Sequence, residues 1–191
     1  MDRKINVAVI VGSLRKESVS RKAALALAKL APEHLDLHIV EIGDLALYNE
    51  DVEAAGAPNS WMRFREEVRA SDAVLFVTPE YNRSVPGALK NAIDVGSRPY
   101  GNSAFSGKPA AIMSLSPGAL GAFGANHHLR QSLVFLDMPI LQQPEAYVGG
   151  AFSLFDERGE LTSEGTQAFF QQFIDAFASW IEATSKVDAL A

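Results

Sequence analysis

The sequence predicts an α/β fold in which helices cover both faces of one doubly wound, five-stranded parallel sheet. Apolar strand-like segments alternate with amphipathic helical segments along the whole chain, a pattern typical of βαβ units. The first and third strand-like segments are almost uncharged, as expected for strands that are buried on both faces. No internal repeat or low-complexity linker interrupts the 191 residues. We therefore expect a single domain over residues 1–191.

The expected elements follow from periodicity and from helix-breaking residues. Pro32 ends the first helix, and Pro86 suits the first turn of the third, because proline has no N–H to donate. Residues 43–58 are expected to be mostly loop. The strands are expected at residues 5–11, 35–42, 72–77 and 110–115, with a short fifth strand near 139–141. The helices are expected at residues 20–31, 59–70, 86–95, 122–136 and 163–186.

Composition argues against several classes of function. The net charge of −6 disfavours a nucleic-acid partner or an anionic membrane surface. The absence of cysteine excludes disulfides, thiolate catalysis and cysteine-based metal sites, and we expect no metal site. No apolar run approaches the roughly 18 residues of a membrane helix, and the N-terminus lacks the apolar core of a secretory signal. These features predict a cytoplasmic protein without a membrane partner.

A doubly wound sheet indicates where a ligand binds. In such sheets ligands occupy the crevice beyond the carboxyl ends of the strands, near the point where the strand order reverses. Three loops of the predicted fold leave those ends, at residues 12–19, 78–85 and 116–121. We call them the first, second and third loops, and expect the site among them.

The first loop is suited to a phosphate group. It leads into a helix N-terminus, whose unpaired N–H groups and positive dipole end attract anions. Ser13, Ser18 and Ser20 add hydroxyl donors, and Arg15 adds a charged fork. An alternative stays open, in which Ser18 or Ser20 caps the helix and Arg15 is a solvated surface residue. The loop matches neither an ATP-type phosphate loop nor the Gly-x-Gly-x-x-Gly motif of dinucleotide-binding folds.

The second and third loops are suited to a flat, polar ring. The second loop has a proline at each end and carries an aromatic and an amide side chain in Tyr81 and Asn82. Such groups fit a planar heterocycle with alternating donors and acceptors, for example an isoalloxazine. The small residues of the third loop allow a backbone to approach a ring closely. Ordinary polar or glycine-rich turns are the alternative for both loops.

Three segments together resemble a known family. They are Gly-Ser-Leu-Arg at 12–15, Pro-Glu-Tyr-Asn at 79–82 and Ser-Val-Pro-Gly-Ala-Leu-Lys-Asn-Ala-Ile-Asp at 84–94. They resemble the NADPH-dependent FMN reductase family, and within it the bacterial chromate and quinone reductases, over about residues 5–182. The resemblance implies a flavodoxin-like fold, non-covalent FMN, NADPH or NADH as co-substrate, and a homo-oligomer, either a dimer or a tetramer.

The resemblance also assigns site residues. It implies that the first loop holds the FMN phosphate and that the other two loops line the ring. Three departures concern acceptor preference and assembly. Val95-Gly96-Ser97 stands where relatives often carry bulkier apolar residues including Trp, and Arg83 stands where a second aromatic is common. His127 stands where relatives can have a tyrosine that links subunits. The implied cofactor-binding residues are Ser13, Leu14, Arg15, Ser18, Ser20, Pro79, Glu80, Tyr81, Asn82, Ser116 and Gly118.

The implied activity is the reduction of a small electron acceptor. Hydride from NAD(P)H would pass through flavin N5 to a quinone, free flavin, azo dye or chromate, so no side chain is expected to be catalytic in its own right. His127 and His128 are expected on a helix away from the ring-facing loops. Two alternatives stay open: an electron carrier like flavodoxin, and a flavin-binding regulatory protein without turnover.

Overall fold

The computed structural model describes residues 4–188 and contains the expected parallel sheet. The strand order is β2-β1-β3-β4-β5, and every neighbouring pair is parallel. This is the order of flavodoxin-like folds, so the predicted fold class is confirmed. The strands are β1 (Ile5–Val11), β2 (Leu35–Ile39), β3 (Ala73–Thr78), β4 (Ala110–Leu115) and β5 (Ala146–Val148).

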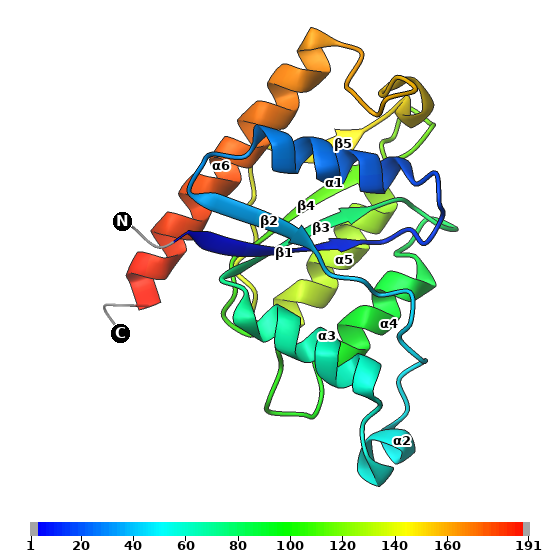
Figure 1. Cartoon of the computed structure of the whole chain (residues 1–191), viewed down its shortest axis with the longest axis vertical. Helices are drawn as coiled ribbons and strands as arrows, with labels where there is room; N and C mark the ends of the chain where they lie inside the picture. Colours follow the sequence, from blue (N-terminus) through cyan, green and yellow to red (C-terminus); the bar gives the residue numbers. More distant parts are fainter. Residues whose placement is uncertain (1–3, 189–191) are drawn as a thin grey trace.

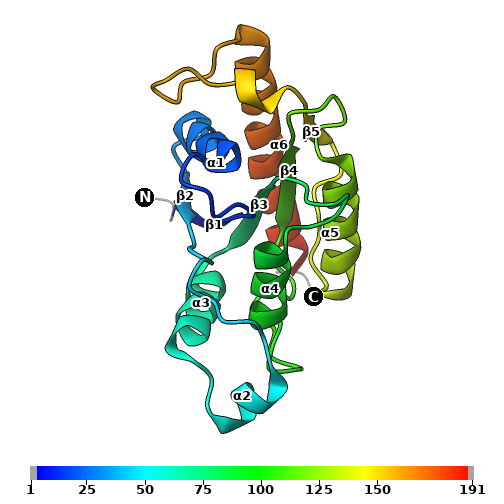
Figure 2. The ribbon, with the colours of Figure 1, turned by 90° about the vertical axis from the view of Figure 1, so that its right-hand side faces the viewer.

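Helices cover both faces of the sheet (Figures 1 and 2). Alternate residues of each strand point to opposite faces, so Val7 and Val9 pack into one core while Ala8 and Ile10 pack into the other. The first core is completed by α1 (Val19–Leu30) and α6 (Glu164–Asp188). The second is completed by α3 (Asn59–Ala70), α4 (Gly87–Gly96) and α5 (Phe123–Phe135).

The fifth strand lies later in the chain than predicted. Residues 139–141 meet the sheet only at the start of β4, where Ala110 donates to the Pro139 carbonyl and accepts from the Leu141 N–H. The chain then leaves the sheet through Pro144 and pairs again with β4 at Ala146–Val148. Residues 139–141 resembled a strand because they are apolar and pack against the sheet, with Leu141 buried and Ile140 partly buried, but they do not form the ladder.

A short helix also lies within the segment expected to be mostly loop. This helix, α2 (Glu50–Ala55), contributes no buried residue of its own. It is tied to α3 because Glu53 accepts two hydrogen bonds from the guanidinium of Arg65, one of them at 2.8 Å. Arg65 is buried and also donates to the Val95 carbonyl. The contact with Arg65 lowers the pKa of the Glu53 carboxyl.

The switch in strand order lies between β1 and β3. The chain turns to α1 on one face after β1 and to α4 on the other face after β3, so the two loops diverge at the sheet edge (Figure 2). Gly12 stands where they begin, with its N–H bonded to the Val77 carbonyl at 2.9 Å. A Cβ at this position would lie 2.5 Å from Thr78 Oγ1, so only glycine fits. Among the described residues, no helix combines the length and apolarity needed to cross a bilayer.

Candidate active site

The three loops meet around a cavity of about 220 Å³. The first loop and the start of α1 form one wall, the second loop forms another, and the third loop closes it together with the short helix η1 (Ala151–Ser153). We call it the serine-lined cavity. Its lining residues are Ser13, Arg15, Ser18, Val19, Ser20, Pro79, Glu80, Tyr81, Leu115, Ser116, Pro117, Ala151 and Phe152. Eight of the eleven residues expected at the site are therefore brought together.

The other three expected residues lie elsewhere around the loops. Leu14 lines two neighbouring cavities instead. Asn82 and Gly118 line none of these three cavities; the Gly118 carbonyl accepts a hydrogen bond from Ser116 Oγ within its own loop. The sequence analysis missed Phe152, an exposed aromatic that follows a Gly-Gly pair. The Gly-Gly pair close to a large apolar residue is the sequence feature that could have indicated Phe152 as a site residue.

Of the two serine hydroxyls at the start of α1, that of Ser18 is hydrogen-bonded within the protein and that of Ser20 is not. Ser18 caps the helix, because its Oγ accepts the Arg21 N–H at 3.1 Å. The capping interpretation is therefore right for Ser18. Ser20 is only 3% exposed, yet its hydroxyl has no hydrogen-bond partner among residues 4–188. The first turn of α1 contains no acidic residue. An anion at this helix end would find a free donor and no competing carboxylate on the first turn.

Arg15 supplies a positive charge to the same cavity. Its guanidinium forms no ion pair and no side-chain hydrogen bond within the described part of the chain. A free guanidinium, an unpartnered and nearly buried Ser20 hydroxyl and a helix N-terminus together match the donors that a phosphate monoester needs. The residues present therefore fit the phosphate group of FMN.

The second loop forms a tight hairpin turn. Tyr81 and Ser84 exchange two backbone hydrogen bonds, of 3.1 and 3.0 Å. The two residues between them, Asn82 and Arg83, have φ angles of 51° and 63°. Asparagine adopts this left-handed region readily, whereas arginine is strained there by about 1–2 kcal/mol. Such strain at a ligand-facing loop has to be held in place by the surrounding structure.

Glu80 provides one of the contacts that hold the second loop. Its Oε2 accepts the Ala125 N–H of the first turn of α5 at 3.0 Å, and its Oε1 lies 3.3 Å from the guanidinium of Arg83. A Cβ on Gly124 would lie 2.7 Å from the Arg83 carbonyl oxygen, so the loop and the helix are in close contact. Glu80 lines the cavity, but its carboxylate serves to position the second loop.

The two histidines have separate environments. His128 Nδ1 lies 3.0 Å from Ser84 Oγ, so the expectation that it stands apart from the ring-facing loops was wrong for this residue. A helix start that packs directly against the second loop was not visible in the sequence. His127 Nε2 donates to the Tyr147 hydroxyl at 2.8 Å, because that hydroxyl donates to Glu145 at 2.9 Å. Burial and the Glu145 carboxylate raise the pKa of Tyr147 to about 12. Neither histidine lines the serine-lined cavity.

Two further cavities adjoin the first. The Tyr81-side cavity, of about 280 Å³, is lined by Gly12, Leu14, Arg15, Tyr81, Pro86 and Ala88. The Glu41-side cavity, of about 310 Å³, lies between the first loop and the residues that follow β2. Arg15 lines all three cavities, so the first loop forms the partition between them.

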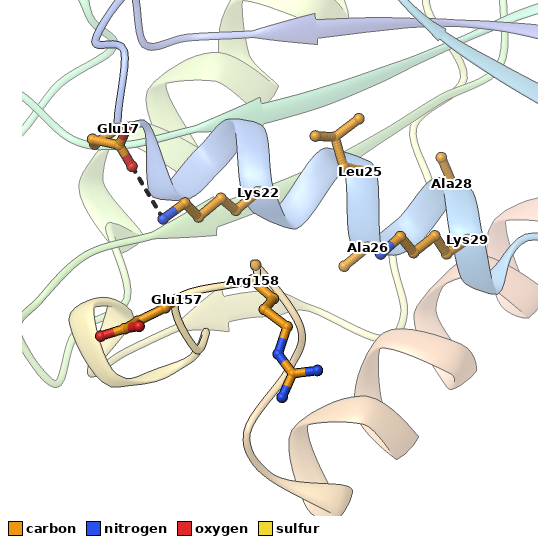
Figure 3. A pocket seen from close by; sticks show the side chains of 9 residues that line it. Glu17, Lys22, Leu25, Ala26, Ala28, Lys29, Glu157 and Arg158 are labelled. Carbon is orange, nitrogen blue, oxygen red and sulfur yellow. Dashed lines mark ion pairs between the residues drawn. The ribbon is translucent and has the colours of Figure 1, made fainter.

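A larger groove, of about 550 Å³, lies along the outer side of α1 and meets the three loops only at Glu17 (Figure 3). It separates the outer side of α1 from the turn at residues 157–159 and shares no lining residue with the three cavities. Two of its lysines already have acidic partners, because Lys22 pairs with Glu17 and Lys29 with Glu160. Size alone does not make this groove the site, since its two lysines are already paired, whereas Arg15 and the Ser20 hydroxyl beside the loops have no partner in the described residues. Within the described residues, no cluster of three or more His, Asp or Glu could hold a metal.

The strand order and the phosphate-fitting loops at the switch point define a flavodoxin-like protein with a nucleotide cofactor site. The family model for NADPH-dependent FMN reductase matches residues 5–153, and the chain belongs to this family. FMN is therefore its cofactor and NAD(P)H its reductant, as the sequence resemblance implied. The protein is an FMN-dependent NAD(P)H oxidoreductase.

Three known proteins illustrate the similarity. A quinone reductase of Pseudomonas putida is 67% identical over 187 residues, which cover 98% of this chain and all of the relative. A 2-hydroxy-1,4-benzoquinone reductase of Burkholderia is 43% identical, covering 93% of this chain and 96% of the relative. The solved structure of FerB, a flavoenzyme NAD(P)H:(acceptor) oxidoreductase from Paracoccus denitrificans, is 46% identical with a TM-score of 0.89, covering 94% and 98% of the two chains.

Proposed function

We propose that the protein reduces quinones with electrons from NAD(P)H, using FMN bound in the serine-lined cavity. The observation that carries this proposal is that the Ser20 hydroxyl and the Arg15 guanidinium both line the cavity at the N-terminus of α1. Neither group has a hydrogen-bond partner among the described residues. Quinone as the acceptor is supported by the names of the Pseudomonas putida and Burkholderia relatives.

The first loop would bind the phosphate. Arg15 can offer two parallel N–H groups to phosphate oxygens, and Ser20 can donate its free hydroxyl. The N–H groups of the first turn of α1 lie at the same end and add their dipole. Ser18 would act indirectly, because its side chain is committed to the Arg21 N–H. In a chain of net charge −6, this local arrangement is what allows an anion to bind.

The second and third loops would orient the ring. When bound, FMN supplies the redox chemistry, taking hydride from the nicotinamide and passing electrons to the acceptor. Pro79 and Tyr81 border the cavity on one side and Ser116 on the other. Glu80 and His128 fix the second loop against α5. Its backbone groups are therefore already in place, and no entropy has to be spent on ordering the loop when the ring binds. We assign no side chain a catalytic role.

We further propose a homo-oligomer, a dimer or a tetramer, with α4 and α5 at or near the contact. The outer side of α5 carries large exposed apolar residues, including Phe123, Val134 and Phe135. Val134 and Phe135 are adjacent at the end of α5 and Phe123 lies at its start, and exposed apolar side chains of this size indicate a surface that another chain covers. Light scattering at micromolar concentration should give a multiple of 20.6 kDa. A species of single-chain mass alone would contradict this proposal.

We also propose that the enzyme works in the cytoplasm, where NAD(P)H is available.

The activity is tested with the purified protein. We expect a flavin absorbance spectrum that bleaches with NADPH under anaerobic conditions and recovers when benzoquinone is added. Steady NAD(P)H consumption with benzoquinone should exceed that of free FMN at the same concentration. Bleaching without turnover would favour an electron carrier or a regulatory flavin protein instead. Free flavin, an azo dye and chromate in the same assay would rank the other acceptors.

A further inference from the structure

The Glu41-side cavity carries two charged side chains, Arg21 and Glu41, that the proposed FMN site does not use. It lies between the first loop and the residues just after β2, and Figure 1 shows β2 directly beside β1. It shares Ser13, Leu14 and Arg15 with the neighbouring cavities. The charged side chains that line it are Arg15, Arg21 and Glu41. Arg15 is already assigned to the FMN phosphate, so Arg21 and Glu41 are the two charged groups left for another ligand.

Arg21 and Glu41 form an ion pair in this cavity. The guanidinium Nη2 lies 2.6 Å from Glu41 Oε1, and roughly half of each side chain remains exposed to solvent. The hydrogen bond and the negative charge of Glu41 raise the pKa of Arg21. Because surface ion pairs contribute at most about 1 kcal/mol, a phosphate group can displace Glu41 from Arg21 at little cost.

We propose that the Glu41-side cavity binds the adenosine half of the nicotinamide nucleotide, with Arg21 contacting the 2′-phosphate of NADPH and Glu41 the 2′-hydroxyl of NADH. The proposal rests on the proposed function, which requires a nicotinamide nucleotide. An acidic side chain at the end of the second strand commonly accepts the ribose 2′-hydroxyl in α/β dinucleotide sites, and an arginine nearby accommodates a 2′-phosphate. Here both residue types stand at that position, although the glycine motif of those sites is absent.

The neighbouring cavities give the nucleotide a continuous path. The Tyr81-side and Glu41-side cavities both include Leu14 and Arg15 in their linings. A nucleotide with its nicotinamide near Tyr81 and its adenosine near Glu41 would pass Leu14, which lines both cavities. Because Arg21 can exchange Glu41 for a phosphate, we expect the enzyme to use both NADPH and NADH.

Binding of two nucleotide fragments tests the proposal without turnover. Calorimetric titration of the FMN-loaded protein would use 2′,5′-ADP, which carries the 2′-phosphate, and 5′-AMP, which does not. Arg21→Ala should weaken 2′,5′-ADP binding by roughly ten- to a hundredfold, with much less effect on 5′-AMP. Glu41→Gln should tighten 2′,5′-ADP binding. The matched control is Lys22→Ala, since Lys22 follows Arg21 on α1 and also pairs with an acid, but lines the separate groove of Figure 3.

Kinetics gives a second measurement. The ratio of kcat/KM for NADPH to that for NADH should fall about tenfold or more in Arg21→Ala, rise in Glu41→Gln and stay unchanged in Lys22→Ala. Equal loss of both fragments in Arg21→Ala, or an unchanged kinetic ratio in a protein that still oxidises both nucleotides, would overturn this proposal alone. Failure of the wild-type protein to oxidise either nucleotide would instead contradict the proposed function.

Discussion

The Glu80 carboxylate accepts a hydrogen bond from the Ala125 N–H at 3.0 Å, across 45 residues of sequence. This contact joins the second loop to the first turn of α5, where the helix has unsatisfied N–H groups. The Ser84 hydroxyl meets His128 one turn further along the same helix. The strained turn at Asn82 and Arg83 is therefore held from both sides, which is what a rigid cofactor-facing loop requires.

Removing the Glu80 carboxylate should loosen the second loop. We expect Glu80→Ala to lower the free energy of unfolding by about 1–2 kcal/mol, because the Ala125 N–H loses its acceptor. Glu80→Gln is the control, since an amide oxygen can still accept that hydrogen bond. Urea unfolding of the three proteins measures the difference. The interpretation fails if Gln and Ala are equally destabilising, because the hydrogen bond would then not be the important contact.

Arg15 should determine how tightly FMN binds. One charge-assisted contact to phosphate contributes about 1.5–3 kcal/mol, so Arg15→Ala should raise the FMN dissociation constant roughly ten- to a hundredfold. Quenching of flavin fluorescence on titration with apoprotein provides the measurement. Lys16→Ala is the matched control, because Lys16 is an exposed neighbour that does not line the serine-lined cavity. A dissociation constant that Arg15→Ala leaves unchanged would show Arg15 to be only a surface residue.

Substitutions of Ser18 and Ser20 should change different properties, the first the stability of the fold and the second the affinity for FMN. Loss of the helix cap in Ser18→Ala should cost about 0.5–2 kcal/mol of folding free energy. Ser20→Ala removes a hydroxyl without a protein partner, so it should leave stability nearly unchanged and weaken FMN binding. Thermal unfolding of the apoproteins and FMN titration give the two readouts. If Ser20→Ala bound FMN as tightly as the wild type, its hydroxyl would have no part in the phosphate site.

Tyr147 should ionise at a higher pH than an ordinary tyrosine side chain. Its pKa is raised to about 12 by burial and by Glu145, against an ordinary value near 10. A raised folded-state pKa means that the resulting stability is present below about pH 10 and is lost as the pH rises toward 12. Absorbance titration near 295 nm should show a high-pH step that disappears in Tyr147→Phe. A titration in which Tyr147→Phe removes a step at ordinary pKa would contradict the assignment.

Neither histidine should be essential for catalysis. An essential general acid or base contributes roughly 10²–10⁴-fold, whereas His127→Ala and His128→Ala should each retain turnover within about tenfold. The effect of His128→Ala should be the larger, since its contact with Ser84 supports the second loop. The measurement is kcat with NADPH and benzoquinone, with and without added FMN. A loss above a hundredfold with FMN still bound would give a histidine a direct role in the chemistry.

The sequence by itself determined the fold class and the edge of the sheet at which a ligand is expected. Apolar periodicity depends on neighbouring residues, so β1, β3 and β4 and the helices α1, α3 and α4 could be identified from local pattern. The rule that parallel strands present their carboxyl ends at one edge then selected three loops, which the structure brings together around one cavity. The family resemblance identified FMN and NAD(P)H, and the family model supports both.

Only the tertiary structure decided which side chains in those loops are free to bind a ligand. Ser18 and Ser20 look alike in the sequence, but a single hydrogen bond to Arg21 commits Ser18 and leaves Ser20 available. The Glu80 carboxylate is already hydrogen-bonded to the Ala125 N–H of α5. In the same way, β5 begins at Ala146 because the chain pairs with β4 again there. Hydrogen bonds between distant segments depend on how helices and strands pack. Local periodicity does not predict that packing, because it depends only on residues that are neighbours in the sequence.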